Sequence, residues 1–148
     1  CIFVEPSQAP AMFLGVRTGR HSDISVQDIG LTGATAADGL AVARPSRFIG
    51  PTIGPLISGF AAIPDEVIRA GVGVLHETEG IDVEPSATAG LTIPWRMGDA
   101  AAESAPGIHL VWLTGGAMVP DDECAAYVDE GRGLVERIGS TASAIFVD

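Results

Sequence analysis

The first apolar segments of the chain are short, and glycine or proline ends each of them. Residues 1–4 are continuously apolar and are followed by Glu5-Pro6, a pattern typical of a short buried strand. Residues 9–17 mix large and small apolar side chains and end on Arg17, which predicts a helix. Gly19 lies just beyond them and is expected to end that helix.

The next forty residues contain few periodic segments. Residues 18–36 are polar, glycine-rich and aperiodic, which predicts a loop, and residues 37–42 predict a short strand or an extended turn. Three prolines and two glycines in residues 45–56 allow at most a short helix. Ser58–Ile63 is apolar enough to predict a second, weaker strand.

The clearest helix is expected to begin at Pro64-Asp65-Glu66 and to end at Gly80. Proline suits the first turn of a helix, and the helix dipole favours carboxylates there. The residues that should form its buried face keep the spacing of an amphipathic helix. They are Val67, Ala70, Gly71, Val74, Leu75 and Thr78.

The second half of the chain contains the strongest strand signal. Residues 81–84 predict a brief extended piece, and the small residues from Ser86 onward predict a helix packed closely on another backbone. Ile108–Thr114 is almost continuously apolar, which is typical of a parallel strand covered on both faces. Gly115-Gly116 follows, and a further helix is expected to open near Pro120.

Strands separated by helices predict an α/β fold, with a mostly parallel sheet flanked by helices and right-handed crossovers. The chain has 148 residues, enough for one domain that buries roughly 70% of its unfolded surface. We expect that domain to cover residues 1–131, with residues 132–148 as a tail. Charged residues make up 18%, below the usual ~25%, which suggests that part of the surface is normally covered.

Charge and cysteine content narrow the function classes. The net charge is −11 and no basic cluster is present, which argues against a nucleic-acid partner. Every apolar run is interrupted well before the ~18 residues of a membrane span. Cys1 and Cys124 do not make a disulfide framework, so a reducing, cytoplasmic setting is expected.

The chain contains no lysine, because all eight of its basic residues are arginine. A GC-rich coding bias explains why arginine replaces lysine on a surface. The absence also excludes Schiff-base chemistry carried out by this chain alone, since no ε-amine is present. A P-loop lysine is excluded for the same reason.

The first candidate for a ligand contact is Thr114-Gly115-Gly116, at the carboxyl end of the strongest predicted strand. Ligands of open α/β sheets bind at the carboxyl ends of strands. A threonine hydroxyl there can donate to a ring nitrogen, and glycines let the backbone approach a flat ligand. A plain strand-to-helix turn with a threonine cap is the commoner origin of such a tripeptide.

Three weaker candidates involve carboxylates and turns. Asp38-Gly39 fits a loop lining a site, or a simple turn. Glu84, before Pro85, fits a residue facing a cofactor ring, or a solvated side chain at a helix N-terminus. Glu5, with backbone carbonyls nearby, fits an oxygen site for a cation, or a surface turn.

The three histidines do not form a metal-binding pattern. His21, His76 and His109 are scattered, and none has metal-ligand spacing to another histidine or a cysteine. His76 falls within a predicted helix and His109 at the start of a predicted strand. Both are therefore expected to be structural.

Taken in order, five segments resemble one family, the bacterial D-serine dehydratases (D-serine ammonia-lyases) of the fold type II, tryptophan-synthase-β-like pyridoxal-phosphate enzymes. The similarity covers roughly residues 1–132, and it is strongest in the segments 3–6, 24–30, 35–42, 84–87 and 109–120. Ala117, Ala43 and Arg47 depart from it, since they stand where glycines are expected.

The resemblance implies that pyridoxal 5'-phosphate is the cofactor, an amino acid the substrate, and loss of water from D-serine to give pyruvate and ammonia the reaction. Thr114 would bond the pyridine nitrogen, with Gly115 beside it, Gly39 along the ring face and Glu84 in the same wall. Glu5 and the carbonyl of Ala9 match the place where relatives hold a monovalent or divalent cation. Ala11 stands where one relative has a second acidic ligand.

The family's Schiff-base lysine, substrate loop and phosphate cup precede the matched region in the family's order, and none is found in this sequence. We therefore expect a C-terminal piece of the large domain, inactive alone, whose partner is the missing N-terminal part of the same polypeptide. Two alternatives stay open. One is another fold type II enzyme, an L-serine or threonine dehydratase or a racemase; the other is a lysine-free binding domain with vestigial enzyme ancestry.

Overall fold

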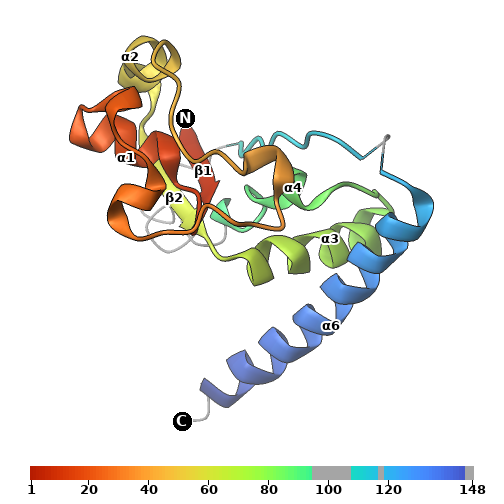
Figure 1. The fold of residues 1–148 in the computed structure, drawn as a ribbon. Helices are drawn as coiled ribbons and strands as arrows, with labels where there is room; N and C mark the ends of the chain where they lie inside the picture. The colour runs from red at the N-terminus through yellow and green to blue at the C-terminus, as the bar shows by residue number, and fades with distance from the viewer. Residues whose placement is uncertain (95–107, 117–118, 146–148) are drawn as a thin grey trace. The chain divides into compact units, whose positions relative to one another are not determined.

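The computed structural model describes residues 1–94, 108–116 and 119–145, and the side chains of the last stretch as far as residue 137. These residues fall into two compact units, Cys1–Asp65 and Glu66–Asp148, which we take in turn. Figure 1 shows the helices and strands along the chain.

A two-stranded parallel sheet organises the first unit. Strand β1, Ile2–Pro6, pairs with β2, Gly59–Ile63, in a register that places Ile2 opposite Gly59 and Pro6 opposite Ile63. The strands predicted at residues 1–4 and 58–63 are therefore confirmed.

Aromatic side chains cover one part of this sheet. The ring of Phe60 lies 6.1 Å from that of Phe3 and 5.7 Å from that of Phe13, between centroids. Such tilted and edge-on pairs are the arrangement that aromatic quadrupoles favour.

Helix α1, Ala11–Thr18, confirms the helix predicted at residues 9–17. Pro10 precedes its first turn, and Gly19 ends it with a left-handed φ of 67°, a conformation that glycine adopts without a steric penalty. The buried side chains of the core beneath α1 are Ala11, Leu14, Ile24 and Val26, with Leu31 and Ala43 packed against them.

The rest of the first unit consists of loops and short turns, as expected for residues 18–36 and 45–56. Helix α2 covers only Ile49–Ile53. The strand or extended turn expected at residues 37–42 is wrong, because Asp38–Leu40 forms a 3₁₀ turn. The carbonyl of Ala37 accepts the N–H of Leu40 at 2.8 Å, which closes the backbone where an extended segment would need an outside partner.

The second unit contains helices α3, Asp65–Glu79, α4, Pro85–Thr88, and α6, Asp121–Ile145. Helix α3 begins at the predicted Asp65. Its end is also as predicted, since Gly80 has a φ of 65° and donates its N–H to the carbonyl of His76 at 2.9 Å. Helix α6 opens where expected, next to Pro120, and continues without a break past residues 131 and 132.

The buried face of α3 differs in part from the predicted one. Ile68 and Val72 are fully buried, whereas Thr78 is exposed. The difference arises because two other helices pack on α3. A Cβ on Gly71 would lie 2.9 Å from Thr88 of α4, and one on Gly73 would lie 2.6 Å from the backbone of α6.

Residues 108–116 have no regular secondary structure, so the strand predicted at Ile108–Thr114 is wrong. Their exposure alternates only from Leu110 onward: Ile108, Leu110 and Trp112 are 100%, 86% and 80% exposed, while Leu113 packs against the core. The residues that the structure describes provide no strand to pair with this stretch. Ile108, Leu110 and Trp112 therefore remain exposed to solvent. We call these three residues the exposed apolar row.

The predicted fold class is confirmed at the coarse level: the described residues form a small α/β structure with a parallel sheet. None of the helices described is long and apolar enough to cross a membrane.

Candidate functional site

The segment Thr114–Gly116 lies directly against residues 82–84 in the second unit. Gly115 and Gly116 both have left-handed φ values, 70° and 129°. A Cβ on Gly115 would overlap the carboxylate of Glu84, and one on Gly116 would lie 2.7 Å from the carbonyl oxygen of Asp82. The two glycines are thus required by conformation and by close approach.

A small hydrophobic core holds this contact in place. Leu75 of α3, Val83 and Ala87 are its buried members, and Leu113 packs against them. Because neighbouring side chains of an extended backbone point in opposite directions, an inward Leu113 turns Thr114 outward. Thr114 is indeed exposed, and its hydroxyl makes no hydrogen bond to a described residue.

Glu84 precedes α4, whose first residue is Pro85. Its carbonyl accepts the N–H of Ala87 at 3.0 Å, which begins the helix, and its half-buried carboxylate lies against Gly115. The structure therefore brings together three of the residues singled out from the sequence, namely Thr114, Gly115 and Glu84.

The remaining candidates belong to the first unit, at the carboxyl edge of its parallel sheet. Gly39 is exposed in the middle of the 3₁₀ turn Asp38–Leu40. Asp65, just after β2, accepts hydrogen bonds of 2.6 Å from the Thr35 hydroxyl and from the N–H of Ala36. These bonds tie the Gly39 loop to the strand ends, where ligands of α/β sheets bind.

Glu5 is 5% exposed, and its carboxylate faces the start of α1. The two oxygens accept the N–H groups of Met12 and Phe13 at 2.8 and 2.9 Å. Burial raises the pKa of Glu5, and the hydrogen bonds from Phe13 and then Met12 oppose that rise. Glu5 thus satisfies backbone donors that a helix start leaves without partners.

The second expected cation ligand also has a structural partner, since the carbonyl of Ala9 accepts the N–H of Ala11 at 2.9 Å. Among the described residues, no three or more His, Cys, Asp or Glu side chains are grouped so as to hold a metal ion. The cation site at Glu5 and Ala9 stays a prediction.

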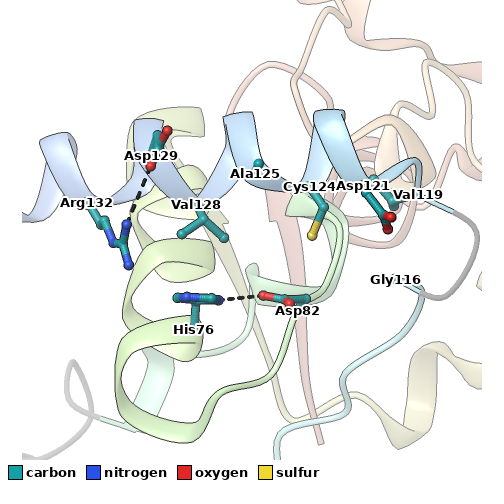
Figure 2. A pocket seen from close by; sticks show the side chains of 10 residues that line it. All are labelled: His76, Asp82, Gly116, Val119, Asp121, Cys124, Ala125, Val128, Asp129 and Arg132. Carbon is teal, nitrogen blue, oxygen red and sulfur yellow. Dashed lines mark hydrogen bonds and ion pairs between the residues drawn. The ribbon is translucent and has the colours of Figure 1, made fainter.

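A cavity of about 690 Å³ lies beside this segment in the second unit, between α6 and the end of α3. Figure 2 shows the residues that line it: His76, Asp82, Gly116, Val119, Asp121, Cys124, Ala125, Val128, Asp129 and Arg132. Nδ1 of His76 lies 2.6 Å from Oδ1 of Asp82. Burial, then the carboxylates of Asp82 and Asp121, raise the pKa of the Cys124 thiol, so the neutral thiol is favoured.

The His76–Asp82 pair was not foreseen from the sequence. The available signal was its position, since the two residues stand on either side of the helix stop Gly80. A chain that reverses at such a stop brings the last helical turn next to the residues that follow it.

No family model matches the chain. Among curated proteins, it is 45% identical over 147 residues to a probable D-serine dehydratase of Pseudomonas aeruginosa, across 92% of this chain and 33% of that protein. It is 46% identical to the D-serine dehydratase of Serratia proteamaculans and 45% identical to that of Escherichia coli O157:H7, each over 142 residues, 89% of this chain and 32% of theirs. The chain is thus homologous to D-serine dehydratases over most of its length and spans about a third of theirs.

Proposed function

We propose that this chain supplies the wall that contacts the pyridine ring in a pyridoxal-phosphate-dependent D-serine ammonia-lyase, a fold type II enzyme that converts D-serine to pyruvate and ammonia. The observation that carries the proposal is the outward Thr114 hydroxyl on a glycine segment backed by Glu84, in a chain 45% identical to D-serine dehydratases.

The residues present suit one part of such a cofactor. Glu84 and the backbone of Asp82 and Val83 lie against the two glycines of the Thr114–Gly116 segment, so among the described residues a flat ring would have to approach from the opposite side. The Thr114 hydroxyl makes no hydrogen bond to a described residue, so it would be available to a ring nitrogen there. The lysine that would bind the cofactor covalently is absent from the sequence.

Bound pyridoxal phosphate supplies an electron sink for the carbanion formed at the substrate Cα. Thr114 would set how strong that sink is, because a hydroxyl can hydrogen-bond the ring nitrogen but cannot protonate it as a carboxylic acid can. A milder sink favours prompt loss of the β-hydroxyl over transamination. Glu84, which lies against Gly115, would limit the space around the ring, and water with it.

The proposed enzyme also needs the rest of the polypeptide and a cellular compartment. The remaining two thirds of the relatives' length would provide the lysine and the phosphate site, and the cytoplasm would be the compartment. Residues 1–131 would form part of the cofactor domain. A monovalent or divalent cation near Glu5 and Ala9 is the least supported part, given the hydrogen bonds both groups already accept.

The test is a chimera in which this chain replaces the homologous third of the Pseudomonas aeruginosa relative. We expect it to bind the cofactor and to release pyruvate from D-serine faster than the corresponding products from L-serine or L-threonine. Deamination of the L-amino acids alone would contradict the D-serine assignment and favour another fold type II dehydratase.

Thr114 is tested in the same chimera. Thr114→Val removes the hydroxyl at similar volume and should lower kcat about tenfold or more, since a hydrogen bond to a ligand group is worth roughly 1.4 kcal/mol. Thr114→Ser should keep most of the activity. Thr78→Val, at an exposed threonine of α3, is the matched control. Equal activity of the Thr114→Val and Thr78→Val variants would contradict the role of Thr114.

A further inference from the structure

We propose that His76 and Asp82 form a positioning pair that fixes the Thr114–Gly116 segment and thereby aims the Thr114 hydroxyl. The ligand-directed part of this inference rests on the proposed function. The mechanical part concerns only contacts within the second unit.

The pair joins α3 to the chain behind the glycine segment. His76 lies in the last turn of α3, and its Nδ1 is 2.6 Å from Oδ1 of Asp82 (Figure 2). The backbone of Asp82 supports Gly116, because a Cβ on Gly116 would lie 2.7 Å from the Asp82 carbonyl oxygen. The same residue is therefore held by a helix on its side-chain side and meets the glycine segment on its backbone side.

The neighbouring residues repeat this connection in the core. Leu75 precedes His76, Val83 follows Asp82 and Leu113 precedes Thr114, and these three side chains belong to one cluster. Close-packed side chains transmit small displacements. If Asp82 moved relative to α3, Gly116 should therefore move with it, and so should Thr114, two residues away.

The pair holds the side chain of Asp82 on α3, while the packing of Val83 holds the next residue. Residues 81–84 have no regular secondary structure, and the side chains of His76 and Asp82 are 35% and 52% exposed. Val83 is the buried contact of this stretch. The His76 hydrogen bond therefore adds a polar restraint on Asp82, beside the packing of Val83, which also lies against Gly116 and clusters with Leu75 of α3.

Other charged and titratable groups face the pair across the cavity. Asp121, Cys124, Asp129 and Arg132 line it from α6, and Glu77 of α3 is engaged by Arg132. A neutral imidazole still donates from Nδ1, so loss of the proton weakens the pair rather than breaking it.

The experiment follows the amide resonances of Gly115 and Gly116 in ¹H–¹⁵N spectra of the full 148-residue chain between pH 5 and 8. In the wild type, both should shift with the same midpoint as the ring protons of His76. In His76→Leu, which removes the donor, both should move to new positions and stop titrating. In His76→Asn, whose amide nitrogen replaces Nδ1, they should return toward the wild-type positions without titrating.

His109→Asn is the control, because His109 is an exposed histidine that precedes the same segment. It should leave the titration of Gly115 and Gly116 intact. Resonances that do not move in His76→Leu, or that still titrate in it, would overturn the proposal. If the pH-dependent shift of Gly115 and Gly116 disappeared in His109→Asn, the shift would come from His109 and not from His76, and the proposal would be overturned as well.

The ligand-directed part is read separately in the chimera. If the pair acts through Thr114, His76→Leu should lower kcat in the Thr114 background and cause little further loss in Thr114→Val. Coupled amide shifts with equal kcat losses in both backgrounds would overturn the aiming of Thr114. If Thr114→Val itself has no effect, the proposed function fails, while the amide shifts still decide the mechanical pair.

Discussion

At the scale of single residues, the hydrogen bonds that a polar side chain already makes distinguish structural from candidate binding residues. Thr88 is 1% exposed, and its hydroxyl lies 2.6 Å from the carbonyl oxygen of Ile68 and 2.9 Å from that of Pro85. Thr114 is exposed and makes no hydrogen bond to a described residue. Two residues of the same type thus have opposite surroundings, and the sequence around them does not reveal which is buried.

Thr88→Val tests the structural role of a buried threonine. The change keeps the side-chain volume but leaves two carbonyl oxygens of the α3–α4 contact without their donor. We expect the free energy of unfolding to fall by about 1–2 kcal/mol, measured by urea titration. Thr78→Val, whose hydroxyl reaches only the carbonyl of Val74 on an exposed surface, should change it far less.

The pKa values of two carboxylates in the first unit should be shifted in opposite directions from their ordinary values. Burial raises the pKa of Glu5 above 4.5, while the backbone N–H of Ser25 lowers the pKa of Asp28 below 3.8. Side-chain carboxyl ¹³C shifts, recorded from pH 2 to 7, measure both midpoints. A Glu5 midpoint below that of Asp28 would contradict the burial seen here.

These two pKa shifts determine whether each carboxylate makes the free energy of unfolding rise or fall with pH. For Glu5, folding favours the protonated form, so its contribution is full below pH 4.5 and is lost as the pH rises through the raised pKa. For Asp28, the contribution is full above pH 3.8 and is lost as the pH falls through the lowered pKa. Glu5→Gln should remove the first dependence from the difference between variant and wild-type unfolding curves, and Asp28→Asn the second.

At the scale of elements, local signals placed the helix ends well and the buried faces less well. Gly19 and Gly80 end α1 and α3 because a left-handed residue is needed there, a requirement that is visible in the sequence. The face of α3 depends on which helices pack on it. Gly73 is buried because α6 crosses there, and no pattern within α3 states that.

The α3–α6 crossing offers a matched pair of glycines on one helix. A Cβ on Gly131 would lie 2.5 Å from the nitrogen of Gly73, whereas one on Gly133 would meet only a guanidinium nitrogen of Arg137, at 3.4 Å. Gly131→Ala should destabilise the second unit by about 1–3 kcal/mol through overpacking. Gly133→Ala should stabilise it by up to about 1 kcal/mol, because alanine favours the helix.

Thermal and urea unfolding followed by circular dichroism at 222 nm measure both changes. Equal stability of the two alanine variants would mean that the helices do not cross at Gly73 and Gly131.

At the scale of the whole molecule, we predict that the exposed apolar row is covered by another segment in a longer polypeptide. Ile108, Leu110 and Trp112 are 80% exposed or more, in a stretch with no regular secondary structure. The curated relatives are about three times as long as this chain. A strand from the rest of such a polypeptide would convert residues 108–114 into the strand that their composition favours.

The fluorescence of Trp112 tests whether the exposed apolar row is covered in a longer polypeptide. In a Trp95→Phe background it is the only tryptophan, and its emission should be that of a solvent-exposed indole, readily quenched by acrylamide. In the chimera with the first two thirds of the Pseudomonas aeruginosa relative, the emission should shift to shorter wavelength and the quenching should fall severalfold. Unchanged quenching would mean that the row stays uncovered in the longer protein.

The sequence by itself determined the helix starts and ends marked by proline and glycine, the lack of lysine, and the family resemblance, since all three depend on residue identity along the chain. Only the tertiary structure placed Glu84 against Gly115, paired His76 with Asp82, and turned the buried face of α3 toward α6. It also left residues 108–114 outside the sheet that the described residues form. These outcomes depend on which distant segments come into contact, because a strand or a buried face exists only when another part of the chain covers it.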